Sequence, residues 1–140
     1  MKYVLDSCVG FKWLVAEADS DKALGLRDDY RNAVTELIAP NFYPFEVAHS
    51  ITRAERQGRI TTTEGAVAMG SLLCHLPRLV SVLPLLSMAC TISSQTRVGL
   101  FDCLFVALAD REGCEFVTAD ARLLNSLAGQ YPFVIPLSSL

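Results

Sequence analysis

Basic residues are scarce in this chain of 140 residues. It holds 12 Lys and Arg against 15 Asp and Glu, which gives a formal net charge of −3 and a pI near 5.3. Proteins that bind nucleic acid non-specifically carry a broad basic surface, and this composition does not supply one. Any contact with nucleic acid is therefore expected to be local or to depend on a bound metal ion.

Closely spaced cysteine pairs are also missing. The five cysteines are an odd number and lie far apart, at Cys8, Cys74, Cys90, Cys103 and Cys114. The spacing argues against a structural zinc site and a disulfide framework, and free thiols fit a reducing compartment. Asp6 interrupts the first apolar run too early for a signal peptide. We therefore expect a cytoplasmic protein.

Charge is absent from residues 79–96, a stretch long enough to span a bilayer. Pro84 interrupts this stretch, however, and Ser, Thr and Gln make much of it polar. A strand followed by a helix is the better interpretation. We expect no membrane partner.

Short apolar runs alternate with helical patterns along the chain. Strands are expected at 3–5, 38–40, 79–83, 115–118 and 133–135. Helices are expected at 9–15, 19–38, 43–58, 61–76, 85–96 and 99–109, with a short one from Asp120. The alternation predicts a single α/β domain over 1–140, with a central, mostly parallel sheet of four to five strands flanked by helices.

Four carboxylates stand where apolar runs break into turns or helix starts: Asp6, Glu46, Asp102 and Asp120. In an open α/β sheet the carboxyl ends of parallel strands face a common crevice, so acids there can converge. Converging carboxylates repel one another unless a cation lies among them. Mg²⁺ or Mn²⁺ prefers such oxygen ligands and can activate water for phosphodiester hydrolysis.

Each acid has a structural alternative. Asp6 and Asp120 could simply cap helices, and Glu46 could serve the dipole of its helix. Asp102 lies in an apolar run, where a carboxylate is costly without a cation or hydrogen bonds. Glu46 and His49 also match one half of a di-iron motif, but the second helix that such a site needs is not evident.

The motifs resemble a PIN domain of the VapC toxin type. They are Tyr-Val-Leu-Asp-Ser at 3–7, Phe-Glu-Val-Ala at 45–48, Leu-Phe-Asp-Cys-Leu-Phe-Val-Ala-Leu-Ala at 100–109 and Phe-Val-Thr-Ala-Asp at 116–120. The resemblance implies a metal-dependent endoribonuclease, usually the toxin of a bacterial toxin–antitoxin pair. It also implies Mg²⁺ or Mn²⁺ as cofactor, an RNA substrate and a cognate antitoxin.

The resemblance assigns roles to individual positions. Asp6, Glu46 and Asp102 correspond to the core catalytic and metal-binding acids, with Asp120 as a fourth member. Ser7 and Thr118 correspond to hydroxyl groups that support them. One departure is Cys8, which stands where the family often has Asn, and a thiol is a poor substitute for the hydrogen bonds of an amide.

Further residues are candidates for RNA or protein contacts. Lys12, Arg53 and Arg56 could follow an RNA backbone, although a solvated face paired with acids explains them equally well. Phe11 and Trp13 are expected in the core rather than as stacking platforms. The apolar helices between 65 and 96 favour a homodimer or an antitoxin groove, while a buried core explains many of their residues too.

Two other classes of function fit the size and the α/β pattern of the chain. A receiver-like signalling module needs a paired acid near the first strand and a late Lys, whereas Asp6 stands alone and Phe116 to Ala119 contains no Lys. A PIN-like scaffold that binds proteins without catalysis is the second alternative, and the presence of all four acids disfavours it.

Overall fold

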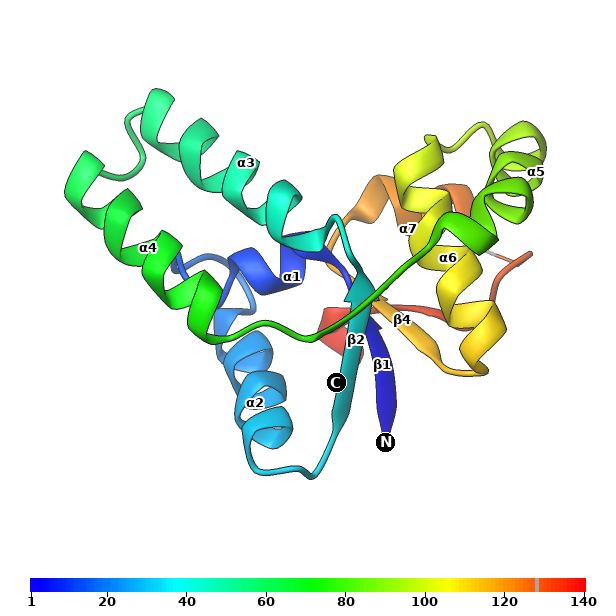
Figure 1. Ribbon diagram of the computed structural model, residues 1–140, viewed down its shortest axis with the longest axis horizontal. Coiled ribbons are helices and arrows are strands. Elements are labelled where there is room, and N and C mark those ends of the chain that lie inside the picture. Colours follow the sequence, from blue (N-terminus) through cyan, green and yellow to red (C-terminus); the bar gives the residue numbers. More distant parts are fainter. Residues whose placement is uncertain (128) are drawn as a thin grey trace.

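The computed structural model describes residues 1–127 and 129–140, and Figure 1 shows its ribbon. Its sheet has five strands in the described residues: β1 (Lys2–Leu5), β2 (Glu36–Pro40), β3 (Arg78–Val80), β4 (Glu115–Thr118) and β5 (Val134–Pro136). Their order across the sheet is β3-β2-β1-β4-β5. Every neighbouring pair is parallel. The predicted α/β class and parallel sheet are confirmed.

Helices cover both faces of the sheet (Figure 1). They are α1 (Ser7–Phe11), α2 (Ser20–Arg31), α3 (Tyr43–Arg56), α4 (Thr62–Cys74), α5 (Leu86–Thr96), α6 (Leu100–Glu112) and α7 (Ala121–Leu127). Side chains alternate along each strand, so Tyr3 and Leu5 join a core with α1 to α4. Val4 joins a second core with α5 to α7.

The helix predicted over 19–38 is wrong in its second half. α2 ends at Arg31, and 36–40 form β2. Ala33 has a positive φ of 58°, which interrupts the helix. Leu37 and Ile38 are fully buried in opposite cores, as a strand between two helical layers requires. Their spacing matched the helical period only by coincidence.

Two further boundaries differ from the sequence prediction. α1 ends at Phe11 rather than continuing to Val15, and the Trp13 side chain instead packs toward α2, where its Nε1 donates to the Ala23 carbonyl at 2.7 Å. β3 covers only Arg78–Val80, because Leu83–Leu85 form a short 3-10 helix that contains Pro84.

Local sequence signals mark the start of α4 and the end of α6. Thr61 Oγ1 accepts from the Glu64 amide at 3.1 Å, and Glu64 Oε1 accepts from the Thr61 amide at 2.9 Å, so the capping box of α4 forms. α6 ends at Gly113, whose φ of 62° permits a left-handed cap.

Two inner helices approach each other very closely. α1 carries Gly10 against the fully buried Tyr43 of α3, and a Cβ at Gly10 would overlap the Tyr43 hydroxyl. Glycine is therefore required there by space, not by backbone conformation. The contact fixes where α1 and α3 begin relative to each other, and both helices begin beside the candidate site.

No single helix in the described part of the chain is long and apolar enough to cross a membrane. By length and composition, one bent pair passes that test, Leu83–Thr96 with Leu100–Glu112, whose axes differ by 116°.

Candidate active site

Asp6 and Asp120 follow the two central strands of the sheet. β1 and β4 are neighbours with Leu5 opposite Val117, and the Asp6 amide continues the ladder by donating to the Val117 carbonyl at 3.1 Å. The chain runs outward from β1 to β3 and then returns beside β1 as β4. Such a reversal opens a crevice at the carboxyl ends of the strands, where α/β proteins commonly bind ligands.

Glu46 and Asp102 reach this crevice from the two helical layers. Each lies in the first turn of its helix, Glu46 on α3 and Asp102 on α6. Because α3 and α6 cover opposite faces of the sheet, the four acids come from both layers and from the strand ends between them (Figure 1).

The acids share one electrostatic environment. Burial raises the pKa of Glu46 to about 7, and the charges of Asp6 and Asp102 add to the shift. Burial likewise raises the pKa of Asp102 to about 6, with contributions from Asp6 and Asp120. The pKa of Asp6, which is only 5% exposed, is also raised by burial. The structure thus brings all four predicted acids together.

Two hydroxyl groups hold the carboxylates in place. Thr118 Oγ1 donates to Asp6 Oδ2 at 2.6 Å. Ser7 Oγ is 3.1 Å from Glu46 Oε1 and 3.4 Å from Asp6 Oδ1, so it connects two acids. Hydrogen bonds from donors favour the charged form of a carboxylate and partly oppose the effect of burial.

Three cavities open around the acids. One of about 440 Å³ is lined by Cys8, Arg53 and Asp120 among others. A second, of about 370 Å³, is lined by Ser7, Glu46 and aromatic side chains. A third, of about 320 Å³, contains Asp102, Asp120 and Arg122 in its lining. Glu46, Asp102 and Asp120 thus each line at least one of three open recesses, which suits an extended substrate better than a small enclosed one.

Comparison with known proteins identifies the family. Residues 3–129 match the PIN domain. This chain belongs to the PIN domain family.

Two solved structures share the fold at low sequence identity. PAE2754 from Pyrobaculum aerophilum has a TM-score of 0.70 at 16% identity, covering 99% of this chain and 94% of that one. VapBC2 from Rickettsia felis, bound to a DNA fragment from their promoter, gives a TM-score of 0.62 at 14% identity, with 97% of each chain covered. No curated protein matches by sequence.

The strand order separates this PIN domain from receiver modules. Receivers have the order 2-1-3-4-5, whereas the order here is β3-β2-β1-β4-β5. The receiver-like alternative is therefore wrong.

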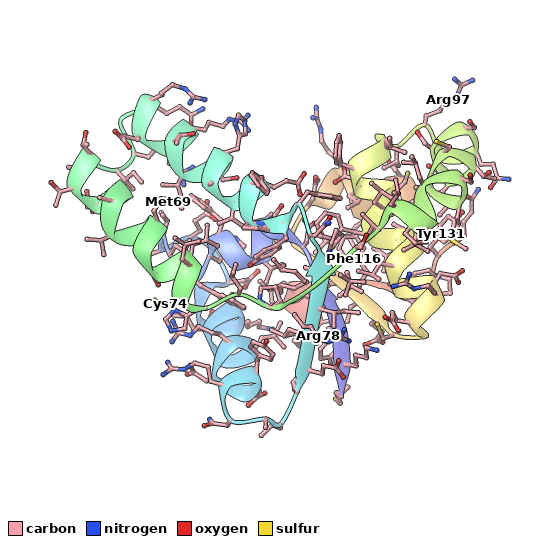
Figure 2. All side chains as sticks on the ribbon, viewed as in Figure 1. Met69, Cys74, Arg78, Arg97, Phe116 and Tyr131 are labelled. Carbon is pink, nitrogen blue, oxygen red and sulfur yellow. The ribbon has the colours of Figure 1, made fainter. Side chains whose placement is uncertain are left out.

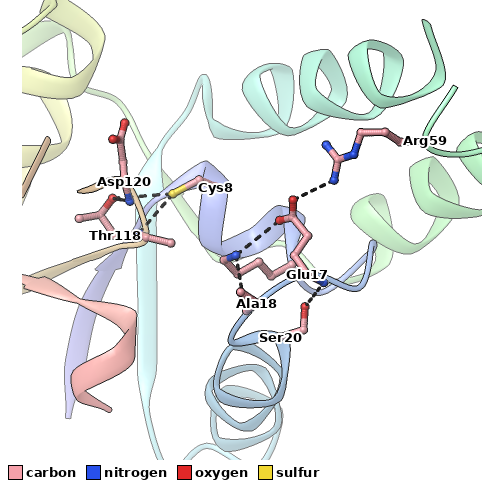
Figure 3. Close-up of polar contacts among 9 residues, drawn as sticks. Cys8, Glu17, Ala18, Ser20, Arg59, Thr118 and Asp120 are labelled. Atoms are coloured by element: carbon pink, nitrogen blue, oxygen red, sulfur yellow. Dashed lines mark hydrogen bonds and ion pairs between the residues drawn. The ribbon is translucent and has the colours of Figure 1, made fainter. Parts of the chain in front are cut away.

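Cys8 makes more contacts in this PIN domain than the sequence suggested. Its Sγ accepts from the Ala119 amide at 3.4 Å and lies 3.7 Å from Thr118 Oγ1, as Figure 3 shows. Burial raises the pKa of the Cys8 thiol well above its usual range, and the Asp6 charge adds to this. A neutral thiol thus connects α1 to the loop after β4.

Asp120 has the capping role that the sequence offered for it, and it also acts electrostatically on Asp102. Its Oδ1 accepts from the amides of Arg122 at 2.9 Å and Leu123 at 3.3 Å, so it caps α7. Its side chain is exposed and still raises the pKa of Asp102. Its amide donates to Thr118 Oγ1 at 3.1 Å, which ties it to the support of Asp6.

The predicted basic residues differ in their availability. Lys12 is held by the Ala18 carbonyl at 2.8 Å and by Glu17, which also pairs with Arg59 at 3.0 Å (Figure 3). The Arg56 Nη1 donates to Thr52 Oγ1 at 3.3 Å, and Arg56 lines none of the three cavities around the acids. Arg53 lines the cavity beside Cys8 and Asp120.

Sequence reasoning missed two arginines at the third cavity, Arg97 and Arg122. Arg122 follows Asp120 by two residues, and this proximity was the available signal. The Arg97 side chain extends away from the body of the molecule beyond α5 (Figure 2). Phe11 and Trp13 are 6% and 8% exposed, so their prediction as core residues is confirmed.

Proposed function

We propose that this PIN domain is a divalent-metal-dependent endoribonuclease and the toxin of a type II toxin–antitoxin pair. The observation that carries the proposal is the convergence of Asp6, Glu46, Asp102 and Asp120 at the switch point of the sheet. Membership of the PIN family supports the nuclease assignment. The fold shared with VapBC2 of Rickettsia felis supports the toxin assignment.

The donor set fits Mg²⁺ or Mn²⁺. Carboxylate and hydroxyl oxygens surround the crevice, and these are the ligands that hard cations prefer. Across 1–127 and 129–140, no three His, Cys, Asp or Glu form a ready-made metal site. Mg²⁺ does not need one, because it keeps several waters and uses one or two carboxylates together with substrate phosphate.

Asp6 and Asp102 are proposed as the direct ligands, with Glu46 and Asp120 binding directly or through water. A divalent ion, when bound, would lower the pKa of a water molecule that it coordinates, and its positive charge would stabilise a phosphate oxygen. Burial and the neighbouring acids raise the pKa of Glu46 to about 7, and the charge of a bound cation would favour the ionised form that binds it. Ser7 Oγ lies 3.1 Å from Glu46 Oε1 and orients this carboxylate.

Arg53 and Arg122 are proposed as phosphate contacts on either side of Asp120. Each lines a different cavity that contains Asp120, so a strand passing the acids could meet one guanidinium before the scissile phosphate and one after it. Guanidinium groups bind phosphate through paired hydrogen bonds. Lys12 lines the same cavity as Arg53 but contributes less in this proposal, because the Ala18 carbonyl and Glu17 already bind its ammonium group. Arg56 contributes less because it lies outside the linings of the three cavities and donates to Thr52.

An antitoxin and a second copy of the chain are the proposed protein partners. Large apolar side chains are exposed on α4, on α5 and on the short 3-10 helix before α5, namely Val67, Leu73, Leu83, Leu86 and Met88. Val67 and Leu73 lie on α4, whereas Leu83, Leu86 and Met88 lie on or just before α5, at the opposite end of the molecule (Figure 1). Exposed apolar side chains commonly mark protein interfaces, so each group is a separate candidate surface.

The experiment is cleavage of a 5′-labelled single-stranded RNA pool by the purified chain with Mg²⁺ or Mn²⁺. We expect cleavage that EDTA stops, and a loss of at least about 100-fold in Asp102→Asn, since changing even a residue that only supports a metal ligand commonly costs about 10- to 100-fold. Asp110→Asn is the matched control, because Asp110 is exposed on the same helix. In cells, Asp102→Asn should abolish growth arrest, whereas Asp110→Asn should preserve it.

A catalytically inactive scaffold is the remaining alternative. It predicts neither cleavage nor binding of Mn²⁺ that depends on the acids. Retained cleavage in a folded Asp6→Asn, Asp102→Asn double variant would contradict the nuclease site proposed here. Calorimetry with Mn²⁺ on the wild type and on this double variant separates the enzyme from the scaffold.

A further inference from the structure

Two exposed phenylalanines directly precede two of the acids. Phe45 comes before Glu46 at the start of α3, and Phe101 comes before Asp102 at the start of α6. Their side chains are 76% and 56% exposed. Both line the cavity of about 370 Å³ that also contains Ser7, Glu46 and His49. We call this cavity the aromatic recess.

Phe101 is held in place by a row of aromatic rings. Its ring meets that of Phe42 edge to face, with centroids 5.0 Å apart. Phe42 in turn meets the buried Phe105 at 5.4 Å, and Phe105 stacks on Phe116 in the core. The exposed ring therefore rests on a rigid support, which lowers the entropic cost of binding against it.

We propose that the aromatic recess binds one unstacked nucleobase of a single-stranded RNA beside the scissile phosphate. This inference rests on the proposed nuclease function and deepens it. Phe45 and Phe101 supply aromatic contact to the base, and His49 supplies polar atoms for its edge. Single-stranded RNA is commonly recognised by bases that leave the stack and pack on aromatic side chains.

The composition of the recess favours a base over a phosphate or a peptide. Lys and Arg are absent from the described residues that line it, so it attracts the neutral part of a nucleotide. Glu46 and Ser7 belong to both the recess and the acid cluster, so an occupant is directly adjacent to the chemistry. The large exposed aliphatic side chains, which suit a protein partner better, lie on other elements.

A double-mutant cycle between protein and RNA tests the inference. Fluorescent hexauridylate and six versions with one abasic position each are titrated by anisotropy into Asp102→Asn protein with Mg²⁺. We expect one abasic position to weaken binding by about 5- to 150-fold, the range that stacking of one base on an aromatic side chain gives. When Phe45→Ala and Phe101→Ala are added to the protein, the same abasic position should weaken binding by little more.

Matched variants separate stacking from general damage. Phe45→Tyr with Phe101→Tyr should restore the penalty at the abasic position, because both rings are retained. Val34→Ala, at a side chain 64% exposed between α2 and β2, should leave binding unchanged. Equal abasic penalties with and without the two phenylalanines would overturn the inference and leave the recess for a protein side chain. Undetectable binding of hexauridylate would overturn it too.

The outcome is independent of the test of the nuclease. Cleavage with no coupling between the phenylalanines and the base refutes the recess and leaves the nuclease in place. Coupling between the phenylalanines and the base, without cleavage by the wild-type chain, refutes the nuclease and leaves the recess in place.

Discussion

Thr118 connects three parts of the site through a single hydroxyl group. Its Oγ1 donates to Asp6 at 2.6 Å, accepts from the Asp120 amide at 3.1 Å and lies 3.7 Å from Cys8 Sγ. Thr118 is fully buried, so these partners replace water that the hydroxyl and the Asp6 carboxylate cannot reach. Loss of this group leaves a buried carboxylate with fewer donors, which is costly.

Thr118→Val therefore tests the support of Asp6 with almost no change of shape. We expect a loss of about 1–3 kcal/mol in the free energy of unfolding, together with a fall in cleavage. Urea denaturation and the RNA assay measure the two effects. Thr118→Ser keeps the hydroxyl and should stay close to wild type in cleavage. Equal stability of the Val and Thr proteins would show that the hydrogen bond contributes little.

The cysteines should differ in reactivity. The thiolate is the reactive form, and burial raises the pKa of Cys8 well above its usual range. Cys74 and Cys90 are exposed. Iodoacetamide at pH 7.5 should therefore modify Cys74 and Cys90 well before Cys8, as peptide mass spectrometry would detect. Early labelling of Cys8 in folded protein would contradict the neutral, buried thiol.

At this scale the sequence located the acids but not their surroundings. Asp6 and Asp120 could be predicted because strand ends in a parallel sheet share one edge. The bond between Cys8 and the Ala119 amide could not, because it depends on how α1 packs against the loop after β4. The aromatic recess was missed because the two phenylalanines are 56 residues apart in sequence and meet only when the two helical layers assemble.

At the scale of elements, the contact between α1 and α3 sets the spacing of Ser7 and Glu46. Gly10 leaves room for Tyr43, whose hydroxyl is buried and has no hydrogen-bond partner in the described part of the chain. The two helices thus meet over a tightly filled space that tolerates no added methyl group.

Gly10→Ala should destabilise the fold by about 1–3 kcal/mol, the usual cost of overpacking. Gly25→Ala is the matched control, since Gly25 lies in α2 with open space around it; there alanine should stabilise by about 0.5–1 kcal/mol. Thermal unfolding measures both. Adding Tyr43→Phe to Gly10→Ala removes the nearest clashing atom and should recover part of the loss. An unchanged melting temperature in Gly10→Ala would refute the close contact between Gly10 and Tyr43.

Most elements followed from local sequence, and the exceptions have a physical cause. α3 and α4 carry clear helix signals, Pro44 in the first turn of α3 and the capping box at Thr61 and Glu64 of α4, so their existence was predicted correctly. β2 was partly assigned to a helix because a strand buried on both faces shows a continuous apolar run rather than alternation. Which face each of its residues contacts is decided by the layers of the whole domain.

At the scale of the whole molecule, the clustered acids make the free energy of unfolding depend on pH. The pKa values of Glu46 and Asp102 in the folded state, about 7 and about 6, lie above their ordinary values because of burial and mutual repulsion. Between pH 4.5 and 7 the folded protein therefore binds more protons than the unfolded chain. Stability must fall as pH rises through this window.

In EDTA, the melting temperature should therefore increase as pH is lowered from 8 to 5.5. Both groups are partly exposed, so solvent screening limits each contribution to about 1 kcal/mol. Glu46→Gln with Asp102→Asn should flatten the profile and stabilise the protein at pH 8. Differential scanning calorimetry at several pH values provides the measurement. If the melting temperature of the double variant depended on pH as steeply as that of the wild type, the pH dependence would not come from Glu46 and Asp102.

The pairing of β1 with β4 divides the site between two halves of the chain. The turn at 97–99 separates Asp6 and Glu46 from Asp102 and Asp120, yet Tyr3 to Leu5 pair with Glu115 to Val117 in the middle of the sheet. A ribosome that stops before β4 releases a polypeptide without its central strand partner. We expect such a product to lack the proposed nuclease activity, and separately expressed halves form a candidate split reporter whose activity returns only on reassembly.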